Sequence, residues 1–327
     1  MGDKVLSAIG LGCMGMSDVY GPADRHESIR TIHAALDAGI TLVDTGDFYG
    51  SGHNELLLRE ALAGRKRDEV FVAVKFGAMR SPLRAFAGTD CRPAAVKNFL
   101  SYTLQRLGME YIDLYQPARV DPNVPIEETV GAIKEMIEAG FVRHVGLSEA
   151  GADTLRRAHQ VHPIAWLQIE YSLMSRSIEA EILPAARELG VPISAYGVLS
   201  RGLLSGRWSS VRASNDPRTR NFPRFNSDNL ESNLALVEAV RRVAEREGLT
   251  VAQAALAWVR SRGDDVIPLI GARTRAQLRE ALETLDRPVS AEALAEIESS
   301  IPPDAVAGDR YNTDGMMALD SERTRRS

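Results

Sequence analysis

The sequence has few cysteines, no surplus of positive charge and no long apolar run. Only Cys13 and Cys91 occur among 327 residues, which argues against a disulfide framework and favours a reducing compartment. The formal net charge of -5 provides no basic surface for nucleic acid. No apolar run approaches the roughly 18 residues of a membrane span, and no secretion signal is recognisable at the start. We therefore expect a cytoplasmic protein without nucleic-acid or membrane partners.

Proline and glycine, at 15 and 26 residues, do not gather into a linker. Domain boundaries usually fall in such linkers. We therefore expect residues 1–327 to form a single domain. A chain of this length buries enough apolar surface to need no disulfide or metal.

Short apolar runs alternate with segments whose apolar residues have helical spacing. Apolar residues at consecutive positions are typical of strands that are covered on both faces. The runs predict eight strands: Ala8–Gly12, Thr41–Asp44, Val70–Lys75, Ile112–Gln116, Arg143–Ser148, Ala165–Tyr171, Pro192–Gly197 and Val266–Gly271. The spacing predicts helices over Ile29–Leu36, Val96–Leu107, Ile126–Ile137 and Ile178–Leu189, and from about Ala152, Glu231, Ala252 and Arg275. Eight alternating units predict an α/β fold, a (β/α)8 TIM barrel with long loops at its C-terminal face.

The run from Gly10 to Gly15 matches the G-x-G-x-x-G pattern and follows a predicted strand. A dinucleotide-binding fingerprint also requires a helix at the last glycine and an acidic residue about 20 positions further on, after the next strand. Here the chain continues through Gly21 and Pro22 before a helix can begin, and Asp37 lies within a helical stripe. We interpret the glycines as a backbone turn and not as a Rossmann fingerprint.

Polar residues stand where the predicted strands end, which is where a barrel of this kind carries its site. Asp44 ends the second strand, Tyr49 follows it, and Lys75 ends the third strand. A lysine cation about 4 Å from a tyrosine supplies, at an effective dielectric near 20, the roughly 4 kcal/mol that lowers a tyrosine pKa from about 10 to 7. Asp44 would keep the lysine charged. Taken singly, the same residues could be a buried ion pair and a packing tyrosine.

These motifs resemble those of the aldo-keto reductase superfamily, in the branch of bacterial and plant reductases that includes pyridoxal reductase-like enzymes. The resemblance extends from Ile9 to Tyr311. It rests on Gly10–Met16, Asp44-Thr45 with Tyr49-Gly50, Lys75, Gly146–Ser148, Gln168–Ser172, Tyr196–Gly206 and Gly271–Glu280. It implies a barrel that binds NADPH without a Rossmann fold and reduces a carbonyl group on a small-molecule substrate.

The resemblance also implies a role for each matching residue. Tyr49 would be the general acid, tuned by Lys75 and Asp44. The implied cofactor-binding residues are Gly15, Ser148, Gln168, Tyr196, Gly197, Leu199, Arg201, Gly202, Leu204, Gly271, Arg273, Gln277 and Glu280.

Within that set, each part of the cofactor has its own residues. Ser148 and Gln168 would hold the nicotinamide carboxamide, and Tyr196 would stack on the ring. The loop Leu199–Leu204 would wrap the pyrophosphate. Arg273 and Gln277 would bind the 2′-phosphate, to which the arginine fork is suited, and Glu280 would lie beside the adenosine.

One departure from the family pattern bears on activity. The family usually carries a histidine after strand four, in a run like Gln-His-Arg, and Ala118 occupies that position here. That histidine usually orients the substrate carbonyl. The substrate itself depends on the irregular stretches Gly77–Arg92 and Ser205–Asn229, the second of which is long enough to form a lid or binding loop, and on Tyr311 in the tail.

Two other functions compete with reduction. Ala118 favours a cofactor-binding sensor subunit with impaired catalysis, whereas the retained Asp44, Tyr49 and Lys75 favour an enzyme. Lys75 could also form a Schiff base in a lyase or aldolase, although a nearby carboxylate would keep it charged and unreactive. No metal site is predicted, because His159 and His162 have no carboxylate or cysteine cluster beside them.

Overall fold

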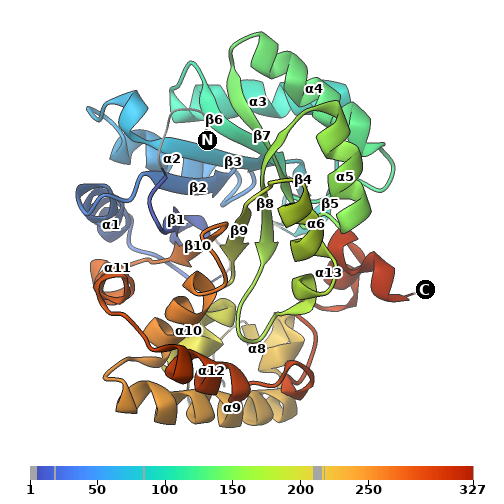
Figure 1. Cartoon of the computed structure of the whole chain (residues 1–327). Helices are drawn as coiled ribbons and strands as arrows, with labels where there is room; N and C mark the ends of the chain where they lie inside the picture. Colours follow the sequence, from blue (N-terminus) through green and yellow to red (C-terminus); the bar gives the residue numbers. More distant parts are fainter. Residues whose placement is uncertain (1–5, 18–19, 84, 209–215, 217, 327) are drawn as a thin grey trace.

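The computed structural model describes residues 6–17, 20–83, 85–208, 216 and 218–326. Eight parallel strands close into a barrel in the order β1-β10-β9-β8-β7-β6-β3-β2 (Figure 1). The barrel strands are β1 Gly10–Gly12, β2 Leu42–Gly46, β3 Phe71–Phe76, β6 Ile112–Pro117, β7 Val142–Ser148, β8 Ile164–Glu170, β9 Ile193–Tyr196 and β10 Val266–Gly271. The predicted (β/α)8 barrel is therefore confirmed.

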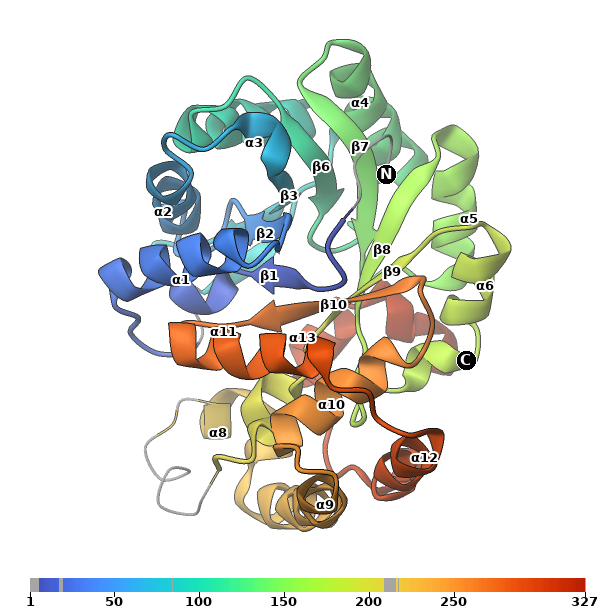
Figure 2. The same cartoon turned by 60° about the vertical axis from the view of Figure 1, so that its left-hand side comes forward.

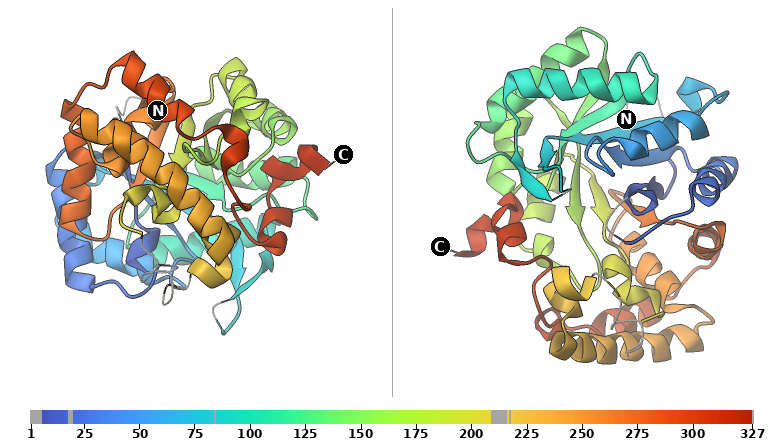
Figure 3. Two further views of the ribbon diagram at one scale, coloured as in Figure 1. Left: turned by 90° about the horizontal axis from the view of Figure 1, so that it is seen from below. Right: turned by 180° about the vertical axis from the view of Figure 1, so that it is seen from behind.

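The helices surround the strands on the outside of the barrel (Figures 2 and 3). They are α1 Arg25–Asp37, α2 His53–Ala61, α3 Pro93–Leu107, α4 Ile126–Glu138, α5 Ala152–Val161, α6 Ile182–Glu188, α8 Arg218–Asn221, α9 Ser227–Arg246, α10 Val251–Arg260, α11 Arg275–Leu282, α12 Ala291–Ser299 and α13 Thr313–Met317. In the described part of the chain, no helix has the length and apolar character needed to cross a membrane.

Local sequence explains where several helices begin and end. Asp24 accepts a hydrogen bond from the backbone N–H of Glu27 at 2.6 Å and caps α1. Pro93 occupies the first turn of α3, and Gly108 ends that helix with a φ of 66°. Thr250 and Gln253 form a capping box at the start of α10.

The apolar core has two layers, which leave one end of the barrel for the site. The larger layer fills the space between strands and helices. The smaller layer fills the barrel interior near the N-terminal ends of the strands, and its buried members are Leu42, Phe71, Ala73, Leu114, Trp166 and Leu269. Leu6 packs against this inner cluster. Because that end is filled with apolar side chains, the polar residues gather at the opposite, C-terminal end.

The structure corrects the predicted elements in three places. Helix α2 was not predicted; it begins after Gly52, which has a φ of 93° and offers no side-chain cap as a sequence signal. The stretch Gly77–Arg92 is not wholly irregular, because it holds an antiparallel hairpin of β4 Ala78–Arg80 and β5 Phe86–Thr89. The helix predicted over Ile178–Leu189 begins only at Ile182, after a separate 3-10 turn.

Two further predictions concern loops. The glycine run leads into a 3-10 turn, η1 Met14–Met16, and the next helix begins at Arg25, so the backbone-turn interpretation is confirmed. Of the predicted lid Ser205–Asn229, residues 209–215 and 217 lie outside the described residues. The described part includes α8, the 3-10 turn η5 Pro223–Phe225 and the first turn of α9.

Candidate active site

A buried ion pair lies at the C-terminal end of the barrel. In the parallel register of β2 and β3, Lys75 stands opposite Gly46, two residues beyond Asp44, so both side chains point into the barrel. The Lys75 ammonium donates a hydrogen bond to one Asp44 carboxylate oxygen, and both residues are 4% exposed. Gln168 reaches across from β8 and donates its amide N–H to the other Asp44 oxygen at 2.8 Å. The predicted pairing of Asp44 with Lys75 is therefore confirmed, and Gln168, which was predicted only as a cofactor residue, joins the same interior network.

Tyr49 lies over this network in the turn that follows β2. The backbone N–H of Tyr49 donates to the carbonyl oxygen of Gly46, and its ring centroid is 5.2 Å from the Lys75 Nζ. A side chain at position 46 would press on Phe48 and Tyr49, because a Cβ there would lie 3.1 Å and 3.4 Å from their rings. Asn54 ties the turn to β1 by donating to the carbonyl oxygen of Cys13 at 2.9 Å. The turn thus holds the phenol next to the lysine.

The pKa of Tyr49 differs from the predicted one, which Lys75 was expected to lower. Burial raises the pKa of Tyr49 well above its ordinary range, and the Asp44 carboxylate raises it further, while Arg119 opposes both. Burial also lowers the pKa of Lys75, although the Asp44 carboxylate opposes that shift. The expectation that Lys75 brings the Tyr49 pKa near 7 is therefore wrong for the protein alone, because desolvation of the phenolate and the nearby Asp44 carboxylate dominate. The phenol stays protonated, as a proton donor must.

The loop after β6 carries Ala118, at the position where the family usually has a histidine, and directly after it a cation, Arg119. The backbone N–H of Ala118 donates to the carbonyl oxygen of Phe76, which holds this loop beside the end of β3. Ala118 is buried and offers only a methyl group. The next side chain, Arg119, donates to the Ala118 carbonyl oxygen at 2.6 Å and to the Tyr311 hydroxyl at 3.2 Å.

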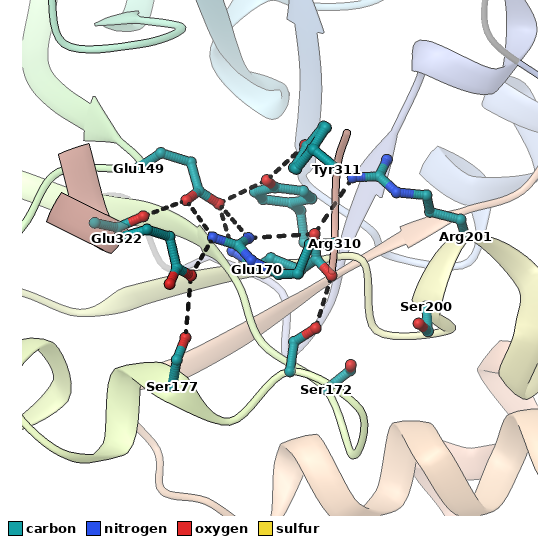
Figure 4. A network of polar contacts seen from close by, with 12 residues as sticks. Glu149, Glu170, Ser172, Ser177, Ser200, Arg201, Arg310, Tyr311 and Glu322 are labelled. Carbon is teal, nitrogen blue, oxygen red and sulfur yellow. Dashed lines mark hydrogen bonds and ion pairs between the residues drawn. The ribbon is translucent and has the colours of Figure 1, made fainter. Parts of the chain in front are cut away.

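Tyr196 is held by Glu149, one member of an acidic network at the ends of β7 and β8. Figure 4 shows Glu149, Glu170 and Glu322 around Arg310. The Tyr196 hydroxyl donates to the Glu149 carboxylate at 2.6 Å and lies 3.1 Å from the Tyr311 hydroxyl. Glu149 has a φ of 55° and forms a two-pronged ion pair with Arg310 of the tail, at 3.0 Å and 2.9 Å. Burial opposes the charge of Glu149, but Arg310 lowers its pKa below the ordinary range. The tail therefore holds the ring expected to stack on nicotinamide.

The end of β7 offers an unsatisfied polar atom where the carboxamide is expected. The Ser148 hydroxyl oxygen is buried and has no hydrogen-bond partner among the residues that the structure describes. Ser148 stands opposite Gln168 in the register of β7 and β8, so the two side chains lie side by side. Buried polar atoms in native proteins are normally paired, so this hydroxyl indicates a site for a ligand polar group. The pair fits a carboxamide.

A strained loop follows β9, where the pyrophosphate is expected. Ser200 and Arg201 have φ values of 45° and 55°, and Gly197 and Gly202 have φ values of 71° and 98°. A Cβ on Gly197 would lie 2.9 Å from the Glu170 side chain, so the backbone must approach closely there. The 3-10 turn η4 Ser200–Ser205 contains Arg201, Gly202 and Leu204, and Leu199 directly precedes it. Within this loop the backbone N–H of Ser200 donates to the carbonyl oxygen of Gly197, and those of Gly202 and Leu204 donate to that of Leu199, so pyrophosphate binding here stays a prediction.

The last cofactor residues lie at β10 and α11. Gly271 ends β10, and the Gln277 amide oxygen accepts from the backbone N–H of Arg273 at 2.9 Å. Gly15 lies against Arg273, since a Cβ there would be 3.3 Å from its side chain. The Arg273 guanidinium donates to the Tyr20 carbonyl oxygen at 2.9 Å, and Arg207 forms a salt bridge with Glu280. Arg273, Gln277 and Gly15 thus lie together, with Glu280 one turn further along the helix.

Sequence reasoning missed the residues that support the site. Glu149 and Arg310 were not singled out, although their ion pair links residues 161 positions apart. Ser321 of the tail also donates to Glu149, at 2.6 Å. No local sequence pattern predicts such a pair. The available signal is two consecutive polar residues, Ser148 and Glu149, at the end of an apolar strand. In the described ranges, no three His, Cys, Asp or Glu side chains come together as metal ligands.

Known proteins resemble this chain over nearly its whole length. The aldo/keto reductase family matches residues 8–302. A relative described as probable aldo-keto reductase 1, from Glycine max, is 41% identical over 309 residues, covering 94% of this chain and 88% of its own. The solved structure of a glycerol dehydrogenase from Gluconobacter oxydans has a TM-score of 0.79 at 32% identity, with 92% of this chain and 94% of that chain covered. An aldo/keto reductase from Klebsiella pneumoniae, solved with NADP and acetate, has a TM-score of 0.72 at 26% identity, with 94% and 95% covered.

Proposed function

The chain belongs to the aldo/keto reductase family, and from that premise we propose that it reduces aldehydes or ketones of small molecules with NADPH, with Tyr49 as the general acid. The observation that carries the proposal is the buried group of Tyr49, Lys75 and Asp44 at the C-terminal end of β2 and β3. A tyrosine above a buried lysine is suited to giving up a proton and having the resulting charge stabilised.

The protein's own part in the reaction is a proton transfer at the Tyr49 hydroxyl. Because burial raises its pKa, the phenol holds its proton until charge develops on the carbonyl oxygen of the substrate. An alkoxide is far more basic than a phenolate, so the proton then moves to the substrate oxygen. The Lys75 ammonium stabilises the phenolate left behind, and Asp44 keeps that ammonium in place. Tyr49 is therefore the proposed catalytic acid, and Lys75 and Asp44 assist it.

The residues at the barrel rim fit a nicotinamide cofactor, which when bound supplies the hydride. Ser148 and Gln168 would hold its carboxamide, and the unpaired Ser148 hydroxyl supports this assignment. Tyr196 would lie against the ring, fixed through Glu149. The η4 loop would bind the pyrophosphate. That a similar structure from Klebsiella pneumoniae was solved with NADP supports the choice of cofactor.

NADPH rather than NADH is proposed because of Arg273. Its guanidinium uses one nitrogen on two backbone carbonyl oxygens, of Tyr20 and Pro22, and no carboxylate neutralises it among the described residues. Its planar fork can therefore bind a 2′-phosphate. Gln277 fixes the backbone of Arg273 just before α11.

A cofactor-binding sensor remains the second candidate, because Ala118 replaces the expected histidine. The retention of Tyr49, Lys75 and Asp44 in one buried cluster favours the enzyme instead. A Schiff base on Lys75 is opposed by the Asp44 carboxylate, which holds the amine in its charged form.

The test is a panel of aliphatic, aromatic and pyridoxal-like aldehydes and matching ketones, followed by NADPH absorbance. Turnover of at least one carbonyl, with tighter binding of NADPH than of NADH, is expected. Arg273→Ser should weaken binding of NADPH and leave that of NADH nearly unchanged, and the exposed Arg156→Ser is the matched control. NADPH binding without any turnover across the panel would contradict the reductase and favour the sensor.

A further inference from the structure

Near Tyr49, the described part of the chain places a guanidinium without a carboxylate partner, that of Arg119. Among the residues described, its hydrogen-bond acceptors are the Ala118 carbonyl oxygen and the Tyr311 hydroxyl, both uncharged, and no carboxylate lies at ion-pair distance. The neighbouring arginines are different: Arg310 pairs with three carboxylates, and Arg201 and Arg224 both face Glu170.

Arg119 lies beside the proposed proton donor. Its loop follows β6, whose Gln116 stands opposite Lys75 in the register with β3. Its charge acts on Tyr49 and on Lys75, where it opposes the raised pKa of the phenol and adds to the lowering of the lysine pKa. Its Tyr311 partner lies 3.1 Å from the Tyr196 hydroxyl, at the proposed nicotinamide side of the pocket.

The nearest acidic group is already satisfied. Glu149 acts electrostatically on Arg119, but its carboxylate accepts hydrogen bonds from Arg310, Tyr196 and Ser321. Figure 4 shows this carboxylate turned toward Arg310 in the acidic network. The charges of Lys75 and Asp44 cancel, as do those of Arg310 and Glu149. Arg119 therefore contributes a net positive charge to this end of the barrel.

An exposed arginine would need no partner, but Arg119 is half-buried and packed against the Tyr311 ring, 5.6 Å from its centroid. A desolvated guanidinium with spare N–H donors strongly prefers an anion, and its fork matches a carboxylate. The Tyr311 hydroxyl hydrogen is directed to the Tyr196 oxygen, because Tyr196 donates its own to Glu149, so Tyr311 would donate to the same anion by releasing Tyr196. Burial opposes ionisation of Tyr311, yet Arg201 and Arg119 lower its pKa, so the phenol is a strong hydrogen-bond donor.

We infer that Arg119, with Tyr311, binds a carboxylate on the substrate, so that carbonyl compounds bearing an acidic group are the favoured substrate class. This inference rests on the proposed reduction at Tyr49. Arg119 would be a specificity-determining residue: it anchors the anionic end of the substrate while the carbonyl end meets the Tyr49 hydroxyl. The space that Ala118 leaves would then be occupied by substrate.

The experiment compares acids with their neutral amides. We would measure kcat/KM for 3- and 4-formylbenzoate and for 3- and 4-formylbenzamide, with wild type, Arg119→Met, Arg119→Lys and the exposed control Arg156→Met. Wild type should prefer at least one acid over its amide. Arg119→Met should lower that acid-to-amide ratio by about 10- to 100-fold, the range of a lost charged hydrogen bond. Any effect of the lost charge on Tyr49 changes the rates of acid and amide alike and therefore cancels in the ratio. Arg119→Lys should keep part of the preference, and the control all of it.

Two results would overturn the inference. One is a wild type that prefers the amides at both ring positions. The other is an Arg119→Met variant in which acids and amides fall equally, because Arg119 would then act on the carbonyl or on the fold. Benzoate and benzamide provide a readout without turnover: with NADP⁺ present, benzoate should raise the Tm of wild type more than benzamide does, and not that of Arg119→Met. Loss of all turnover with the benzoate effect intact would refute the reductase and leave the anion site standing.

Discussion

Asp47 should make the protein less stable as the pH rises, and Asp47→Asn should remove that effect. Asp47 lies in the turn between β2 and Tyr49 and is 8% exposed. Burial raises its pKa from 3.8 to about 8, with a further contribution from the Glu55 carboxylate. In the unfolded chain the same side chain has its ordinary pKa of about 3.9.

The sign follows from proton binding. Between pH about 4 and 8 the folded protein keeps the Asp47 proton that the unfolded chain releases, so rising pH favours unfolding. The contribution of protonated Asp47 to stability is complete below pH about 4 and is lost by pH about 8. At about 1.36 kcal/mol for each unit of pKa difference, the loss reaches about 5 kcal/mol over this range.

Urea unfolding followed by tryptophan fluorescence between pH 5 and 8.5 measures the effect. The free energy of unfolding of Asp47→Asn minus that of wild type should increase by about 1.4 kcal/mol for each unit of rising pH, because asparagine does not titrate. The exposed Asp68→Asn should show no such trend. A difference between Asp47→Asn and wild type that stays constant over the range would refute the reasoning, since Asp47 would then ionise equally in both states.

Three further predictions concern the site. Lys75→Met should lower the free energy of unfolding by about 3–5 kcal/mol in urea titrations, because it leaves the Asp44 carboxylate buried without its cation. Adding Asp44→Asn to this variant should recover part of the loss, and an unchanged unfolding midpoint in Lys75→Met would contradict the prediction. Glu149→Gln should weaken the docking of Arg310, so limited proteolysis should cleave the tail faster than in wild type, and equal rates would argue against the clamp. Because burial raises the pKa of Tyr49, kcat/KM should show no alkaline limb from that phenol below pH about 10, and a limb near pH 7–8 that disappears in Tyr49→Phe would contradict this.

The barrel could be predicted because its signals are local. Strands covered on both faces are apolar at consecutive positions, and β10 was predicted with both ends correct. Helix α3 carries its own start and stop residues in Pro93 and Gly108. Helix α2 lacks such residues, and the β4-β5 hairpin is short and has no buried strand residue, so neither is indicated by a clear sequence pattern.

The site could be predicted in part. The proximity of Asp44 and Lys75 was predicted because all the parallel strands of a barrel end at the same rim. The pKa of Tyr49 could not be predicted, because it depends on how deeply the ring is buried. The pairing of Glu149 with Arg310, and the absence of a carboxylate beside Arg119, depend on how the tail folds back over the barrel, which no short-range pattern records.

The central claim is that the Tyr49 hydroxyl delivers the proton, and a single-turnover measurement tests it most directly. Enzyme loaded with NADPH would be mixed with a carbonyl substrate from the panel in a stopped-flow instrument, comparing wild type with Tyr49→Phe. Loss of a positioned general acid predicts a rate about 10²- to 10⁴-fold lower in the variant, with NADPH affinity unchanged. A Tyr49→Phe variant that transfers hydride at the wild-type rate would contradict the account.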